Sequence, residues 1–253
     1  MRVIEVEQGT GPWLQTRVGR ITSSRMADVM TRPKLTKNGT TRGGITELAG
    51  RRTYRAELVC ERLTGVPSEH HVTRPMQWGI DNEPFARTAY EVGEDVMVDT
   101  VGFVLHPTMD FCGASPDGIV GKDGCLEIKC PTSENFLDWR DFGGVPEEHI
   151  PQMQWVMACC EREWCDFVAF DPRMPQGLRF LVRRMYRDEK RIAEMEFEVI
   201  HFHEEIEQKR LNLSPGHIWA PHMPRIESTE TVSIGDHNVP ADIAEMLDAE
   251  IVP

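Results

Sequence analysis

Residues 115–131, SPDGIVGKDGCLEIKCP, place Asp117, Glu127 and Lys129 on either side of a short turn in a largely apolar stretch. Two carboxylates and a backbone carbonyl, here that of Ile128, suit a hard divalent cation such as Mg²⁺. Such a cation lowers the pKa of a bound water and stabilises charge on a phosphate, while a neighbouring lysine orients or deprotonates that water. The pattern therefore predicts metal-dependent phosphodiester cleavage. The alternative is a surface hairpin with a charged outward face.

The strand pattern decides which of these side chains can meet. Glu127 and Lys129 are two residues apart, so in a β-strand they share one face while Ile128 points to the other. Strict alternation would put Asp117 on the wrong face. We therefore expect the SPDG segment to turn or bulge, so that Asp117 joins the other two.

The dipeptide Asp123-Gly124 lies between two short apolar runs, which predicts a hairpin with a two-residue loop. Such a loop would place Glu127 opposite Val120 and Lys129 opposite Gly118. A glycine opposite the lysine would leave room on that face for a ligand.

The length and composition of the chain limit the classes of protein to which it can belong. A chain of 253 residues with 40% hydrophobic content can form one large domain with appendages. We expect no signal peptide and no membrane segment, hence a cytoplasmic protein. The cysteines include no Cys-x-x-Cys pair, so we expect a reducing compartment and no zinc site. They are Cys60, Cys112, Cys125, Cys130, Cys159, Cys160 and Cys165.

Charge is distributed unevenly along the chain. The net charge of −13 argues against a protein that coats nucleic acid indiscriminately. However, residues 17–55 hold ten Lys and Arg against two acidic residues, whereas residues 188–253 hold fifteen acidic residues against five basic ones. The basic segment can supply phosphate contacts. The alternative is a solvated basic surface.

Periodicity predicts an α/β (α+β) fold with a mixed sheet. Strands are expected between residues 95 and 130 and between 165 and 186. Helices are expected at 21–30 with a serine cap, at 43–65 ending in glycine, at 82–93 with Glu83 in the first turn, around 147–162, and at 188–213. The last should bury Ile192, Met195, Val199, Phe202 and Ile206.

Five motifs in one order resemble the lambda exonuclease (YqaJ-type viral recombinase) family of PD-(D/E)-x-K nucleases. The likeness runs from about residue 5 to about residue 220. It implies a restriction-endonuclease-like core, a central mixed β-sheet flanked by helices, as a domain at 1–220. The motifs are EQGTGPWLQTRVGRITSS, QWGIDNEPFAR, SPDG with LEIKCP, QMQ, and FDPRM.

The resemblance implies a Mg²⁺-dependent exonuclease, with Mn²⁺ as a substitute, that degrades one strand of duplex DNA from its 5′ end. Asp117, Glu127 and the Ile128 carbonyl match the metal ligands of the family. Lys129 matches its catalytic lysine, and Glu83 matches a further glutamate of the site.

The same resemblance implies which residues would recognise the DNA end. Met76 matches an apolar wedge between the terminal base pairs, although it could simply belong to the core. Gln152 is preferred to Gln154, because helical residues two apart do not face the same way. We expect Trp13 to anchor the core. The positions that match the 5′-phosphate pocket are Arg17, Ser24, Ser115 and Gln152, with a plain surface arginine and a helix cap as the alternatives for the first two.

Two departures from the family pattern leave roles open. Pro107 stands where an acidic residue is expected, and Asp110 close by could substitute for it. Glu134 lies near the position of an expected arginine, which puts contacts to the downstream DNA strand in doubt.

The resemblance also implies partners. Family members form rings, commonly trimers, and hand a 3′ single strand to a single-strand annealing protein in phage-type recombination, so we expect a phage or prophage protein in a bacterial host. The alternatives are an endonuclease or nickase on the same core, and a DNA-end-binding adaptor without catalysis. Residues 221–253 extend past the likeness. They contain either a short helix at 240–251 that docks on a subunit or partner, or an acidic tail without fixed structure.

Overall fold

The computed structural model describes residues 1–32, 47–68, 72–213, 231–234 and 237–240. The chain divides into two compact units, Met1–Arg210 and Leu211–Pro253. In the second unit, β10 (Thr231–Ile234) pairs with β11 (His237–Pro240), a hairpin that the sequence did not predict. The expected domain boundary at 220 lies outside the described residues. So does the helix expected at 240–251, except that Pro240 ends β11.

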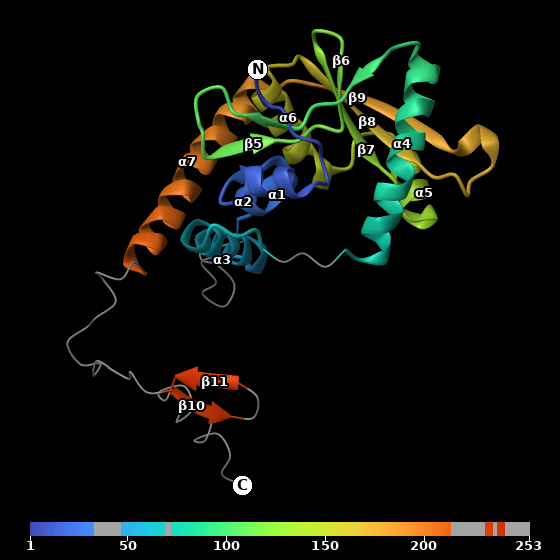
Figure 1. Cartoon of the computed structure of the whole chain (residues 1–253). Helices are drawn as coiled ribbons and strands as arrows, with labels where there is room; N and C mark the ends of the chain where they lie inside the picture. Colours follow the sequence, from blue (N-terminus) through green and yellow to red (C-terminus); the bar gives the residue numbers. More distant parts are fainter. Residues whose placement is uncertain (33–46, 69–71, 214–230, 235–236, 241–253) are drawn as a thin grey trace, which may run out of the picture. The chain divides into compact units, whose positions relative to one another are not determined.

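Two mixed sheets form the larger unit (Figure 1). The predicted mixed sheet is confirmed as a five-stranded sheet of order β3-β6-β7-β8-β9, in which only β7 and β8 run parallel. A second sheet has the order β1-β4-β5-β2. The strands are β1 (Arg2–Ile4), β2 (Ile21–Thr22), β3 (Val98–Asp99), β4 (Phe103–Leu105), β5 (Cys112–Ala114), β6 (Gly118–Val120), β7 (Gly124–Lys129), β8 (Trp164–Phe170) and β9 (Phe180–Tyr186).

Seven α-helices flank these sheets within the described part of the chain. None of them is both long enough and apolar enough to span a membrane. They are α1 (Gly11–Arg17), α2 (Met26–Met30), α3 (Ala49–Thr64), α4 (Arg74–Glu94), α5 (Ser133–Phe142), α6 (Ile150–Cys160) and α7 (Glu189–Asn212).

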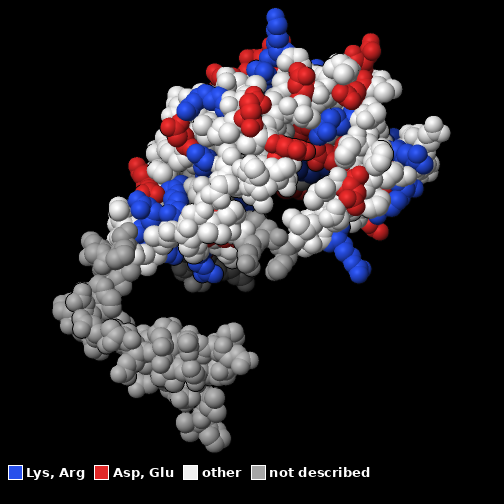
Figure 2. Space-filling model, viewed as in Figure 1, with Lys and Arg blue, Asp and Glu red and all other residues white. Residues whose placement is uncertain are grey.

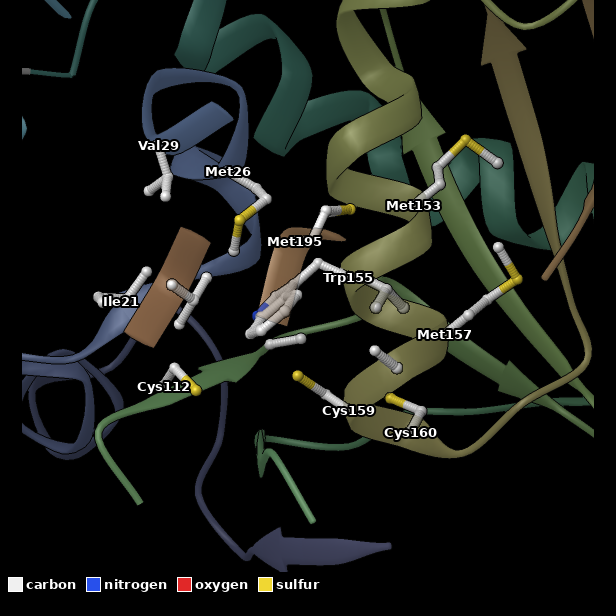
Figure 3. Close-up of a cluster of buried hydrophobic side chains, with 14 of the residues drawn as sticks. Ile21, Met26, Val29, Cys112, Met153, Trp155, Met157, Cys159, Cys160 and Met195 are labelled. Carbon is white, nitrogen blue, oxygen red and sulfur yellow. The ribbon is translucent and has the colours of Figure 1, made fainter. Parts of the chain in front are cut away.

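The main core surrounds α6, which is buried from Met153 to Cys160. A helix that is apolar on every side must be covered on every side. Figure 3 shows Trp155 of α6 in one cluster with Met26 of α2 and Met195 of α7, with sulfur-bearing side chains around it. This helix therefore fixes the two sheets and α7 around one interior.

A smaller core lies under α4, where Tyr90 packs with Leu126 and Val168 of the five-stranded sheet. The helix begins at Arg74, because the Thr73 hydroxyl accepts a hydrogen bond from the Met76 amide. The expected start at residue 82 is therefore wrong. Glu83 lies in the third turn rather than the first.

The other helices differ in how closely they follow the sequence pattern. Helix α7 is confirmed together with its five predicted core residues. Helix α3 ends at Gly65 with φ 69°, as the glycine predicted. The helix expected at 21–30 is wrong in its first half, because Ile21–Thr22 pairs as strand β2. No serine side chain caps α2 or the turn before it.

Candidate active site

Strands β6 and β7 form the predicted hairpin, but in a different register. Gly118 pairs with Leu126, and the loop comprises residues 121–123 with Gly121 at φ 56°. The expected two-residue loop at Asp123-Gly124 is wrong, because the positive φ falls on the earlier glycine. The room expected beside Gly118 is also absent. A Cβ there would meet the Val98 side chain at 2.1 Å.

Glu127 and Lys129 therefore do not lie opposite residues of β6, as the two-residue loop required. They pair with Phe167 and Ala169 of the parallel strand β8. Both partners belong to the main core, whereas Ile128 packs in the smaller core under α4. The prediction that Glu127 and Lys129 share one face, opposite Ile128, is confirmed.

Asp117 reaches this face because the chain bends as it passes from one sheet to the other. Strand β5 belongs to the four-stranded sheet and β6 to the five-stranded sheet, and residues 115–117 connect them. The Asp117 amide donates to the Leu126 carbonyl (3.1 Å). The Ile128 amide donates to Asp117 Oδ2 (2.6 Å). The expected turn in SPDG is confirmed, and it ties the carboxylate to β7.

Helix α4 brings Glu83 to the same place through Arg87, which the sequence reasoning missed. Arg87 Nη2 donates to Glu83 Oε1 (2.6 Å) and to the Asp117 carbonyl (3.1 Å). One guanidinium thus links the helix to the bend. Its spacing of four residues from Glu83 in NEPFAR was the signal that could have revealed it.

The electrostatics of the cluster are those of charges held away from water. Burial raises the pKa of Glu127 to about 7 despite the Lys129 ammonium, and Asp117 adds to the rise. Burial also raises the pKa of Asp117 and of Glu83. Burial alone would lower the pKa of Lys129, but the carboxylates of Glu127 and Asp117 outweigh it and raise that pKa. The ammonium forms an ion pair with Glu127 Oε1.

A divalent cation fits this donor set. Glu127 is fully buried, and its Oε2 has no hydrogen-bond partner among the described residues. A buried carboxylate oxygen left in this way is costly unless a ligand completes it. No group of three His, Cys, Asp or Glu side chains with metal-binding geometry occurs in the described ranges, so a cation bound here would need backbone and water oxygens as further ligands. Figure 2 shows acidic side chains inside a recess where Figure 1 places β7 beside α4.

Three of the four residues predicted to hold a 5′-phosphate gather around Trp13. The Trp13 indole donates to Ser115 Oγ (2.9 Å), and the Arg17 guanidinium stacks 4.1 Å above the indole ring. Arg17 Nη2 donates weakly to Ser24 Oγ (3.4 Å). Trp13 is half-buried, so it orders this cluster rather than anchoring the core as expected.

Arg17 has the properties of an anion-binding group. Burial lowers the pKa of its guanidinium. No carboxylate lies within ion-pair distance of Arg17 in the part of the chain that is described. The cluster adjoins the carboxylates through the chain itself, because Ser115 precedes Asp117 by two residues.

The remaining predicted residues divide between these two clusters and other parts of the surface. Gln154 is buried and donates to the Tyr186 carbonyl, which leaves Gln152 as the glutamine near the surface. Met76 is 50% exposed in the first turn of α4 and is no core residue. Asp110 is exposed and pairs with Arg2 of β1.

Known proteins resemble this chain in sequence and in fold. The family model of the YqaJ-like viral recombinase domain matches residues 12–163. Two crystal structures of an alkaline exonuclease from Laribacter hongkongensis, one in complex with dAMP, are 40% identical to this chain. Each match covers 81% of this chain and 96% of theirs, with a TM-score of 0.72.

A phage-related exonuclease from Haemophilus somnus 129PT is 17% identical, and the match covers 77% of this chain and 96% of that one. Its TM-score of 0.57 shows a shared fold. No functionally curated protein matches the chain.

Proposed function

The chain belongs to the YqaJ-like viral recombinase family, and on that premise we propose that it is a metal-dependent exonuclease. It degrades double-stranded DNA 5′→3′ from 5′-phosphorylated ends and leaves 3′ single strands. The observation that carries the proposal is the unpartnered Oε2 of buried Glu127, beside Asp117 and the Lys129 ammonium. The likeness to one alkaline exonuclease at 40% identity supports it.

The metal in this proposal is Mg²⁺, with Mn²⁺ as a substitute. Asp117, Glu127 and the Ile128 carbonyl would hold it, and it would supply a water of lowered pKa and stabilise charge on the scissile phosphate. Lys129 orients the attacking water from beside Glu127. Glu83, which Arg87 fixes, would accept hydrogen bonds from waters on the α4 side.

End recognition separates an exonuclease from an endonuclease. Arg17, Ser24 and Ser115, with Gln152, form the pocket for the terminal phosphate. A guanidinium without a carboxylate partner suits a terminal phosphate, which it can bind through two hydrogen bonds. Such a pocket selects a strand that begins at the site, so internal phosphodiesters are passed over.

The remaining features of the proposal concern the path of the DNA. Exposed Met76 would wedge between the terminal base pairs, where new contacts offset the lost stacking. A homo-oligomeric ring, a trimer, would keep a protein of net charge −13 on its substrate by enclosure. The 3′ strand would pass to a single-strand annealing protein, as phage-type recombination requires.

The test is nucleotide release in Mg²⁺ from linear duplexes with and without a 5′-phosphate, labelled on one strand to give the direction. We expect rapid release from phosphorylated linear DNA by the wild type and only a slow residual release by Lys129→Ala. Closed circular duplex is the control. Equal cutting of the circle would identify an endonuclease, and binding to ends without release would identify an adaptor.

A further inference from the structure

His149 lies beside the proposed site on an element that carries none of its carboxylates. It ends the short 3₁₀ turn before α6. Its ring stacks on Phe167 with the ring centroids 5.3 Å apart, and it meets Trp139 edge-on at 5.1 Å. Phe167 is the β8 partner of Glu127. The imidazole is therefore fixed on the face of the sheet that carries Glu127 and Lys129.

The polar edge of this ring is unused. Its Nε2 is buried and has no hydrogen-bond partner among the residues described. Burial, together with the positive charge of Lys129, lowers the pKa of His149 to about 4, so the ring is neutral at physiological pH. A neutral imidazole carries one N–H and one lone pair. A neighbouring ammonium favours the tautomer with the lone pair on Nε2.

The Lys129 ammonium has N–H groups that donate no hydrogen bond to the described residues. It carries three N–H groups, and within the described residues it makes one hydrogen bond, to Glu127 Oε1. In the proposed function Glu127 also holds the metal. An ammonium that shares its acidic partner with a cation needs a second acceptor if it is to stay in one position.

We propose that His149 is a positioning residue whose Nε2 accepts a hydrogen bond from the Lys129 ammonium once Glu127 binds the cation. This hydrogen bond then keeps the ammonium directed at the attacking water. This role rests on the proposed function. Stacking on Phe167 and the edge-on contact with Trp139 give the imidazole the rigidity that a positioning group requires.

Kinetics on phosphorylated linear duplex test the role. His149→Phe keeps an aromatic ring on Phe167 but removes the nitrogen. We expect kcat to fall about tenfold, as for loss of one hydrogen bond to a charged group, with KM unchanged. His149→Gln, which restores a polar acceptor, should recover most of the loss. His201→Phe, which alters an exposed histidine of α7, is the matched control and should leave kcat unchanged.

A double-mutant cycle identifies the partner. In a Lys129→Met background, His149→Phe should have no further effect on the residual rate. An undiminished effect in that background would overturn the proposal, because His149 would then act on something else. Wild-type kcat in His149→Phe would overturn it as well.

Nitrogen-15 NMR separates this role from nuclease activity. We expect Nε2 of His149 to be unprotonated in the metal-free wild type and to gain a hydrogen bond when Mg²⁺ is added, and to gain none in Lys129→Met. A protonated Nε2 in the wild type would overturn the proposal whatever the activity. If the bond is present but no nucleotide is released, the proposed function fails and the contact stands.

Discussion

Two buried carboxylates on neighbouring strands of one sheet have opposite surroundings. Asp166 of β8 accepts from Arg184 Nε at Oδ1 (2.8 Å), and from Arg184 Nη2 (2.8 Å) and the Tyr90 hydroxyl (2.7 Å) at Oδ2. Glu127 of β7, equally buried, has Lys129 at one oxygen and no partner at the other. Asp166 is fully paired and supports the fold, whereas Glu127 has an oxygen left for a ligand.

The two groups also serve different elements. Arg184 stacks 3.6 Å above the Trp164 ring and so ties β9 to β8, while Tyr90 ties α4 to the same carboxylate. The pairing of Asp166 holds α4 where Glu83 can meet Asp117. We therefore expect substitutions at Asp166 to act on stability and those at Glu127 to act on catalysis.

The largest expected effect is on turnover. Glu127→Gln should reduce nucleotide release roughly 10²–10³-fold or more, because the metal loses a charged ligand and the transition state loses electrostatic stabilisation. The melting temperature of the metal-free protein should change little, since the amide fills the same volume, Asp117 still attracts the Lys129 ammonium, and burial already disfavours the charged form of Glu127. A collapse of stability in this variant would contradict the comparison. Activity is measured at saturating Mg²⁺, and melting by calorimetry.

The corresponding substitution at Asp166 should change the free energy of unfolding rather than turnover. Asp166→Asn weakens the charge-assisted hydrogen bonds from Arg184, whose side chain is 40% exposed, and we expect a loss of about 1.5–3 kcal/mol in the free energy of unfolding. Urea denaturation measures it, with Asp138→Asn on the exposed side of α5 as the control. Per folded molecule, turnover should stay close to that of the wild type at low temperature. Unaltered stability would show that Asp166 is no structural carboxylate.

A third test compares the carboxylate cluster with the pocket around Trp13. Arg17→Ala should reduce the preference for 5′-phosphorylated over unphosphorylated ends by roughly 10–100-fold, the value of charge-assisted hydrogen bonds. Release from unphosphorylated ends should be nearly unchanged. Arg52→Ala, on the exposed face of α3, is the control. An equal fall on both substrates would place Arg17 in the chemistry rather than in end recognition.

The smallest effect is a pH dependence. Because the pKa of Glu127 is raised to about 7, the folded metal-free protein holds a proton that the unfolded chain releases at the usual pKa near 4.5. Because of the Glu127 carboxyl, the free energy of unfolding falls as pH rises from about 4.5 to 7. A cation must displace that proton, so Mg²⁺ affinity should rise about tenfold per pH unit up to about 7 and then level. Titration calorimetry at several pH values measures it, and a flat profile would contradict the raised pKa.

Local alternation was enough to predict the shared face of Glu127 and Lys129, because it depends on one strand alone. The pairing partners were not predictable in this way. They depend on which glycine takes the positive φ, and Gly121 rather than Gly124 does so. The start of α4 was missed because the cap at Thr73, which decides it, lies nine residues before the expected start at residue 82. No periodicity could reveal His149, since its role depends on where α6 packs beside β8.

The bend at residues 115–117 has a consequence for the size of the product. Ser115 belongs to the proposed phosphate pocket and Asp117 to the proposed metal site, and only two peptide units separate them. Their Cα atoms can be at most about 7 Å apart. The covalent chain thus limits the distance between the bound terminal 5′-phosphate and the phosphodiester bond that is cleaved. In the proposed reaction every step would remove a unit of the same short length, whatever the sequence of the DNA.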